Sequence, residues 1–217
     1  GAFTVAAPGL PRGEAQSVLR FDLAAAASSF DVAFGAGEWS VQSVTLRLTA
    51  APAGNAIFNT PAAGSFGISW LQSDSWIEGT GSPASPGATG ITFTSLQNTY
   101  IGAGDEALGT FSFNGATSGA FDYSLELSPG LVADGLAGSQ LSLRLFAADT
   151  TMSGIFNSRS FSNAAKEGML IARAIGAPVQ PVIAGQNGSA MVMQNVSALR
   201  TSSSKLPLTI AAARAGN

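Results

Sequence analysis

Four carboxylates are the side chains of this sequence best suited to hold a hard cation. Asp74 and Glu78 flank Trp76 in one polar stretch, and Asp105 and Glu106 are adjacent further along the chain. Ca²⁺ takes roughly six to eight oxygen ligands from carboxylates and backbone carbonyls, so these four residues are a candidate calcium site. The alternatives are solvated loop charge and a carboxylate pair that hydrolyses a glycosidic bond, and the second has no other support in the sequence.

Two tryptophans are candidates for stacking on a sugar ring. Trp76 lies between polar residues, and Trp39 opens a strand-like segment. Trp70 is in phase with the apolar Phe66 and Ile68, which favours a place in the core. Core and rim positions of a sandwich remain the alternative for all three, because an indole packs equally well against protein.

Several kinds of chemistry are excluded by composition. The sequence has no His and no Cys, which removes Ser-His and Cys-His catalysis, disulfides, and the usual zinc and haem sites. Its ten basic residues are scattered and its net charge is −3, so nucleic acid is a poor partner. No apolar run reaches the ~20 residues of a membrane helix. We therefore expect a protein that is not an enzyme, has no cofactor other than possible calcium, and does not span a membrane.

Short alternating segments dominate the pattern and predict an all-β fold. The clearest runs from Trp39 to Ala50, and at least six others are separated by turn residues among 26 Gly and 10 Pro. Short helical turns are expected within 24–34 and 131–136. The pattern predicts a two-layer antiparallel sandwich whose core contains Leu19, Phe21, Leu46, Leu48, Leu143 and Leu145. Four arginines occupy polar strand positions, where cross-strand carboxylates would pair with them: Arg20, Arg47, Arg144 and Arg159.

Segments in residues 1–174 resemble, in order, the DNRLRE-type domain of secreted bacterial proteins. They are the strands at 18–23 and 44–48, the W-x-E segment at 76–80 with the strand at 90–93, and closing segments at 142–145, 156–159 and 169–172. The resemblance implies a jelly-roll sandwich on bacterial surface or secreted proteins, some of which bind polysaccharide. Phe93 stands where that family often has Trp, so an aromatic ligand platform is not implied there. Gly168 stands where Pro usually precedes the last strand.

Residues 175–217 lie outside that resemblance and form a C-terminal extension. Apolar residues in two segments are candidate assembly residues: Met191, Met193, Val196, Leu206, Leu208 and Ile210. An extension of this kind can pair with the open edge of a sheet, either in its own domain or in a neighbouring copy. We favour the neighbour, and such a head-to-tail contact does not close on itself and builds a filament.

These observations favour a non-enzymatic structural protein that assembles with itself into a filament or surface layer. The chain begins Gly1-Ala2-Phe3 without a hydrophobic signal core, as in a processed secretory protein or an engineered start. We expect it to be secreted and located at the bacterial cell surface. A carbohydrate-binding module, with polysaccharide as its partner, is the alternative.

Overall fold

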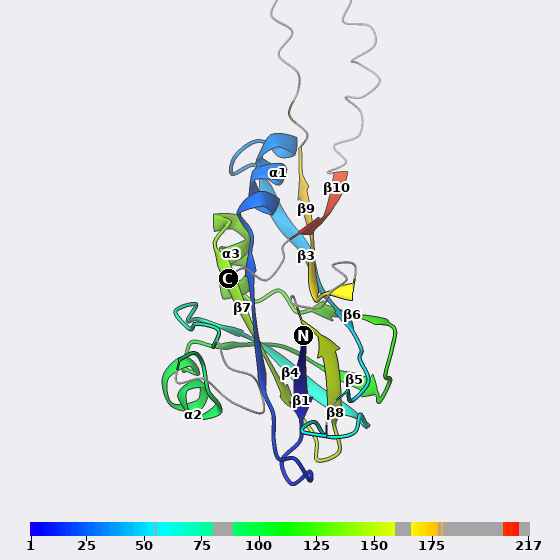
Figure 1. Ribbon diagram of the computed structural model, residues 1–217. Helices are drawn as coiled ribbons and strands as arrows, with labels where there is room; N and C mark the ends of the chain where they lie inside the picture. The colour runs from blue at the N-terminus through cyan, green and yellow to red at the C-terminus, as the bar shows by residue number, and fades with distance from the viewer. Residues whose placement is uncertain (55, 80–88, 159–165, 178, 180–205, 213–217) are drawn as a thin grey trace, which may run out of the picture.

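The computed structural model of this chain describes residues 1–54, 56–79, 89–158, 166–177 and 179, and the backbone of 206–212 (Figure 1). Within these residues the strands pair only in antiparallel fashion, and they form two main layers. The chain is an all-β sandwich with few short helices, as the alternation predicted.

The first layer is a four-stranded sheet in the order β2-β7-β4-β5. The register between β4 and β5 shifts between Ile68 and Ser69, because β5 has one extra residue there, Leu108. The bounds of the four strands are β2 Ser17–Asp22, β7 Gln140–Ala147, β4 Ala63–Leu71 and β5 Glu106–Asn114.

The second layer has the order β10-β9-β3-β6, and the pair β1–β8 continues it. Ala50 N–H donates to Gly119 O on the β6 side of the chain, whereas Ala51 N–H donates to Ile155 O of β8. Strands β8 and β9 therefore follow one another along the same edge of β3. The bounds are β1 Ala2–Ala6, β3 Trp39–Thr49, β6 Ala120–Leu125, β8 Ser153–Asn157, β9 Met169–Gly176 and β10 Leu206–Ala212.

This arrangement is a jelly roll. The pair β1–β8 meets the chain just after β3 through the bridge between Ala50 and Phe156, so one layer has the order β1-β8-β3-β6. The other layer has the order β2-β7-β4-β5. The chain crosses between layers repeatedly, which buries one face of each sheet against the other. Strand β9 lies along the same edge of β3 as β8, and β10 pairs with the outer edge of β9. The predicted architecture, including a strand-forming extension, is confirmed.

Inward-facing residues of the two layers form the main core. Leu46 and Leu48 of β3 and Leu143 and Leu145 of β7 are fully buried, and Phe21 is buried with them. These five predicted core residues are confirmed. Leu19 is only partly buried and packs against the rim of this core. An aromatic cluster fills one end, with edge-to-face and tilted contacts among Phe66, Phe111, Phe113, Tyr123 and Phe156.

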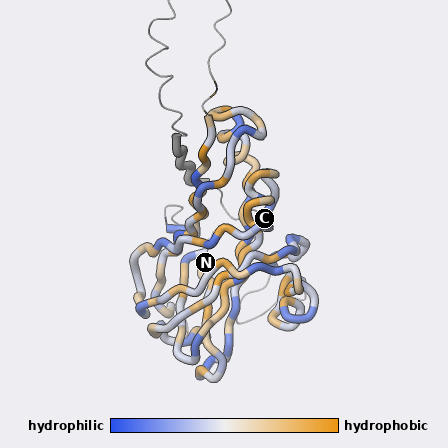
Figure 2. The backbone as a smooth tube through the Cα atoms, turned by 180° about the vertical axis from the view of Figure 1, so that it is seen from behind, coloured by the Kyte–Doolittle hydropathy of each residue, from blue (hydrophilic) through white to orange (hydrophobic). Residues whose placement is uncertain are grey.

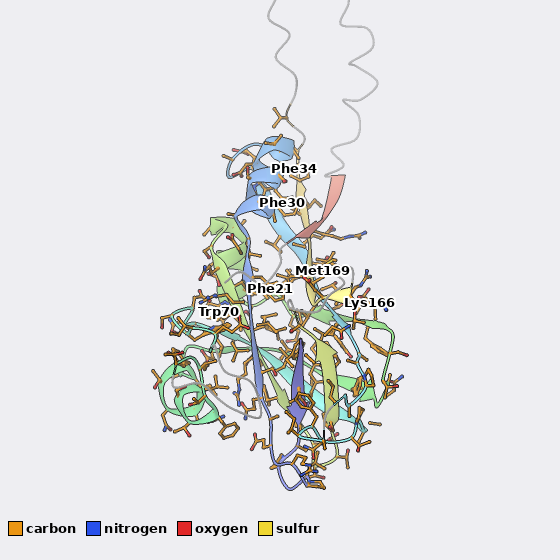
Figure 3. All side chains as sticks on the ribbon, in the orientation of Figure 1. Phe21, Phe30, Phe34, Trp70, Lys166 and Met169 are labelled. Carbon is orange, nitrogen blue, oxygen red and sulfur yellow. The ribbon has the colours of Figure 1, made fainter. Side chains whose placement is uncertain are left out.

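Two helices cover one end of the sandwich. Helix α1, Ala24–Phe34, has three turns, which is longer than the short turns expected, and α3 spans Pro129–Ala137. Ser128 caps α3 by accepting from Leu131 N–H, and Gly138 ends it with a left-handed φ of 62°. Phe30 and Phe34 of α1 belong to a second, smaller core (Figure 3). A short helical segment also lies in the β4–β5 connection, as α2 Phe93–Ser95 and η1 Leu96–Tyr100.

A substitution of Leu46 tests which face of β3 is turned toward the core. The partners of this residue are Tyr123 of β6 and Leu170 of β9, so it lies in the middle of the sheet with no exposed surface. Leu46→Ala should lower the free energy of unfolding by about 2–5 kcal/mol in urea titrations, because it removes buried methyl groups and leaves a cavity. Ile77→Ala, at an exposed position, should change it by less than about 0.5 kcal/mol. Equal losses in the two variants would contradict the assigned phase.

Candidate functional site

In the residues that the structure describes, the C-terminal extension pairs with the outer edge of β9. Strand β9 pairs with β3 on its inner side, with a bulge between Val41 and Ser43. In the described part of the chain, β1 pairs with β8, and its residue Ala6 forms a β-bridge with Ala15. Strand β1 does not pair with β9. Without β10, the N–H and C=O groups along this edge of β9 would have no strand partner, which is the usual condition for strand addition.

Strand β10 pairs with β9 without a break, from Leu206 opposite Gly176 to Ala212 opposite Leu170. The three large apolar positions of β10 are each opposite a small residue of β9. Leu206, Leu208 and Ile210 face Gly176, Ala174 and Ala172 in the register. Large and small residues therefore alternate across the pair, which suits packing between neighbouring strands.

The small residues of β9 are explained by helix α1, which packs over them. Ala174 is fully buried in the second core with Phe30, Phe34 and Trp39. A Cβ atom at Gly176 would lie 2.7 Å from Glu38 O and 2.9 Å from Phe34 Cγ. Any larger residue at this position would push α1 away from the sheet, so β9 carries small residues at the alternate positions over which α1 packs.

Pro207 stands opposite Ile175 in β10, which is the outermost strand of its sheet. Proline lacks an N–H and is confined to such edge positions in sheets. In the structure β10 pairs with β9 of its own chain, which is the folded-back alternative. Residues 177–205 connect the two strands, and a chain of that length can span about 100 Å when extended, so pairing with a neighbouring copy is also within reach. The other predicted assembly residues, Met191, Met193 and Val196, lie outside the described residues.

Trp76 is buried and anchors the segment after β4 to the first layer. Its Nε1–H donates to Ser142 Oγ at 2.9 Å, and the guanidinium carbon of Arg20 lies 4.6 Å from its ring centroid. Arg20 Nη1 donates to the carbonyls of Asp74 and Trp76, both at 2.8 Å. This corrects the interpretation of Trp76 as a sugar platform, because the ring is covered. Arg20, which the alternation placed at a polar strand position with a cross-strand carboxylate partner, is buried and donates to these backbone carbonyls.

Trp39 is also buried, which corrects the second sugar-stacking candidate. Its Nε1–H donates to Asp31 Oδ1 of α1 at 2.7 Å, and its ring lies 4.9 Å from that of Phe30. Trp70 makes the equivalent bond to Asp134 Oδ2 of α3, also at 2.7 Å. Each helix is therefore tied to the sandwich by an indole that donates to its carboxylate. The sequence showed the tryptophans and missed these acceptors.

The four carboxylates proposed for calcium have separate tasks. Asp105 accepts from the backbone N–H groups of Gln72 and Gly102, and Glu106 accepts from Gly130 N–H at the start of α3. Asp74 belongs to the cluster around Trp76, and Glu78 is exposed. No three His, Cys, Asp or Glu side chains in the described ranges come together as a metal site. The predicted grouping is therefore wrong for these residues.

The predicted cross-strand arginine pairs are partly present. Arg47 and Asp122 are opposite each other on β3 and β6, and Arg47 Nε lies 2.6 Å from Asp122 Oδ1. The pair lowers the pKa of Asp122 through the hydrogen bond and the charge of Arg47. Arg144 donates instead to Gln16 Oε1 and lies over the ring of Phe146. Arg159 lies outside the described residues.

Asp74 has the opposite electrostatic environment. Burial raises its pKa, and the nearby charge of Asp134 adds to this, while a hydrogen bond from Ser142 and the charge of Arg20 oppose it. Its Oδ1 atom is buried and has no hydrogen-bond partner among the described residues. The ionised carboxylate is thus less favourable in the folded protein than in water.

Comparison with known proteins adds no identity. A scan against models of protein families finds no match for this sequence, and a search of curated proteins finds none either. Among the described residues, no helix has both the length and the apolar character that crossing a membrane would require.

Asp74 and Asp122 should respond to pH with opposite signs. A raised folded-state pKa makes ionisation destabilising above that pKa, so Asp74→Asn should raise the melting temperature at pH 7 and lose this gain near about pH 3. A lowered pKa makes ionisation stabilising, so Asp122→Asn should lower the melting temperature at pH 7 and have a smaller effect at about pH 3, because this stabilisation is lost as the pH falls through the lowered pKa. Thermal melts at both pH values measure this. A loss of stability at pH 7 in both variants would contradict the environment described for Asp74.

Proposed function

We propose that this chain is a non-enzymatic extracellular structural protein whose copies assemble by strand addition. In an assembly, β10 of one copy pairs with the outer edge of β9 in the next. The observation that carries the proposal is that the edge of β9 is completed by β10, a strand separated from it by residues 177–205. The same seven register pairs serve whether β10 comes from its own copy or from a neighbour. Donation to a neighbour repeats head to tail and produces a filament at the cell surface.

Charge supports the association of the extension with the domain. All 13 acidic residues lie within 1–176, whereas residues 177–217 contain Arg200, Lys205 and Arg214 and no Asp or Glu. Opposite charges on the two parts favour their encounter and disfavour contact between two domains. Polysaccharide binding, the alternative function, has lost the exposed tryptophan rings on which it depended.

Engineered cysteines can distinguish the two arrangements directly, since the sequence has no Cys of its own. Thr209 of β10 is opposite Arg173 of β9. Facing residues in an antiparallel pair lie within the roughly 4.4–6.8 Å between Cα atoms that a disulfide requires. Chains carrying Arg173→Cys and chains carrying Thr209→Cys should be unfolded together in urea, refolded as a mixture and oxidised. We expect disulfide-linked heterodimers on a non-reducing gel.

Two controls make this result specific. Ser124→Cys, at an exposed position of β6 on the opposite edge of the sheet, should not crosslink to Thr209→Cys. A double variant, Arg173→Cys with Thr209→Cys, should give a ladder of linked chains. If the double variant forms only an internal disulfide, β10 folds back on its own domain and the proposal is wrong.

A chain ending at Ala177 should lose assembly, because it keeps β9 whole and lacks the donor strand. Sedimentation and negative-stain microscopy of the truncated and full-length chains at equal concentration measure this. A chain that lacks only residues 213–217 retains β10 and is the matched control. Filaments from the chain ending at Ala177 would contradict strand addition.

A further inference from the structure

Exposed apolar side chains gather at the helical end of the molecule. Six large apolar residues are exposed among those the structure describes, and four of them lie on or beside α1 and α3. Their exposed fractions are 79% for Val32, 53% for Val179, 46% for Leu136 and 42% for Leu127. We call α1, α3 and these four residues the helical cap. In Figure 2 both helices are coloured mainly from white to orange.

The two helices of the cap carry little charge, although the exposed Glu38 and Glu126 adjoin Val179 and Leu127 at its border. Asp31 is the single ionisable residue of α1 and Asp134 that of α3, and each accepts a hydrogen bond from a tryptophan indole. The remaining outward residues of the two helices are Ala, Ser, Pro, Val and Leu. Apolar exposure together with few charges is the composition of the centre of a protein interface.

The cap adjoins the edge at which β10 is added. Val179 N–H donates to Ala33 O at 3.1 Å, so the chain leaving β9 runs along the end of α1. Helix α1 also contacts β10, and Figure 1 shows α1, β9 and β10 together at one end of the molecule. A copy that exchanges β10 with this edge is therefore brought against the cap.

We propose that the cap is a second contact surface between copies of this chain, used together with strand addition at β9. This inference rests on the function proposed above and identifies where the partner copy lies. Strand β10 has seven residues, whereas a stable interface takes roughly 20–30 residues on each side, so strand addition alone leaves room for a further contact. The acidic domains of two copies repel each other, and the helices of the cap, with one carboxylate each, present little charge to a second copy.

Charged residues placed on the cap test this inference. Val32→Glu combined with Leu136→Glu should weaken association of the full-length chain at least tenfold in sedimentation equilibrium, because it buries charge at the contact. Ile77→Glu combined with Phe93→Glu is the matched control. These two residues are also exposed and apolar but lie away from the cap, so association should match the unmodified chain.

The cysteine pair described above separates the two proposals. If copies crosslink through Arg173→Cys and Thr209→Cys while the cap variant associates normally, the cap inference is wrong and strand addition stands. If the chain stays monomeric at all concentrations, both are wrong. A monomeric chain whose melting temperature falls in the cap variant would show that its own extension covers the cap, which also overturns the inference. Weakened association in the cap variant alone, with its melting temperature unchanged, is the expected result.

Discussion

Unpaired backbone groups on one strand determine how this molecule is completed. A sheet edge that exposes its N–H and C=O groups invites pairing, and natural proteins cover or shorten such edges. Here β1 pairs with the outer edge of β8. Strand β9 lies further along the same edge of β3, and β1 does not pair with it in the described residues. The jelly roll therefore ends with an edge that its first eight strands leave open. Only the extension supplies a partner for it in the described residues.

The sequence of β9 has to satisfy two neighbours at once. Helix α1 packs on one face of the strand and requires Ala174 and Gly176 to be small. Strand β10 then places its large apolar residues opposite these small ones. Packing of the helix and recognition of the added strand thus depend on the same residues of β9. A larger residue at either position would disturb the second core and the strand pair together.

Local patterns predicted the strands well because burial alternates with a period of two along a half-buried strand. Leu46 and Leu48 could be assigned to the core for this reason. Trp70, in phase with Phe66 and Ile68, was correctly placed against the core. Trp39 and Trp76 could not be assigned, since their surroundings come from other parts of the chain. Trp76 lies in a mostly polar stretch, yet Arg20 and Ser142 from two other strands cover it. The calcium site was predicted wrongly for the same reason. Asp105 and Glu106 accept hydrogen bonds from backbone N–H groups that only the fold brings near them. Strand β10 was predicted, but its register against β9 was not.

Competition between folding back and donation is decided by concentration and by contacts outside the strand pair. The seven pairs of β9 and β10 are the same in both arrangements, so they favour neither. The connection 177–205 holds β10 near its own β9 at an effective concentration on the order of millimolar. Donation at micromolar protein must overcome a factor of about a thousand, or about 4 kcal/mol. Only interactions made between copies and absent from the folded-back chain can supply this difference. An apolar surface of low charge beside the strand edge is suited to that task, and this is the role proposed for the helical cap.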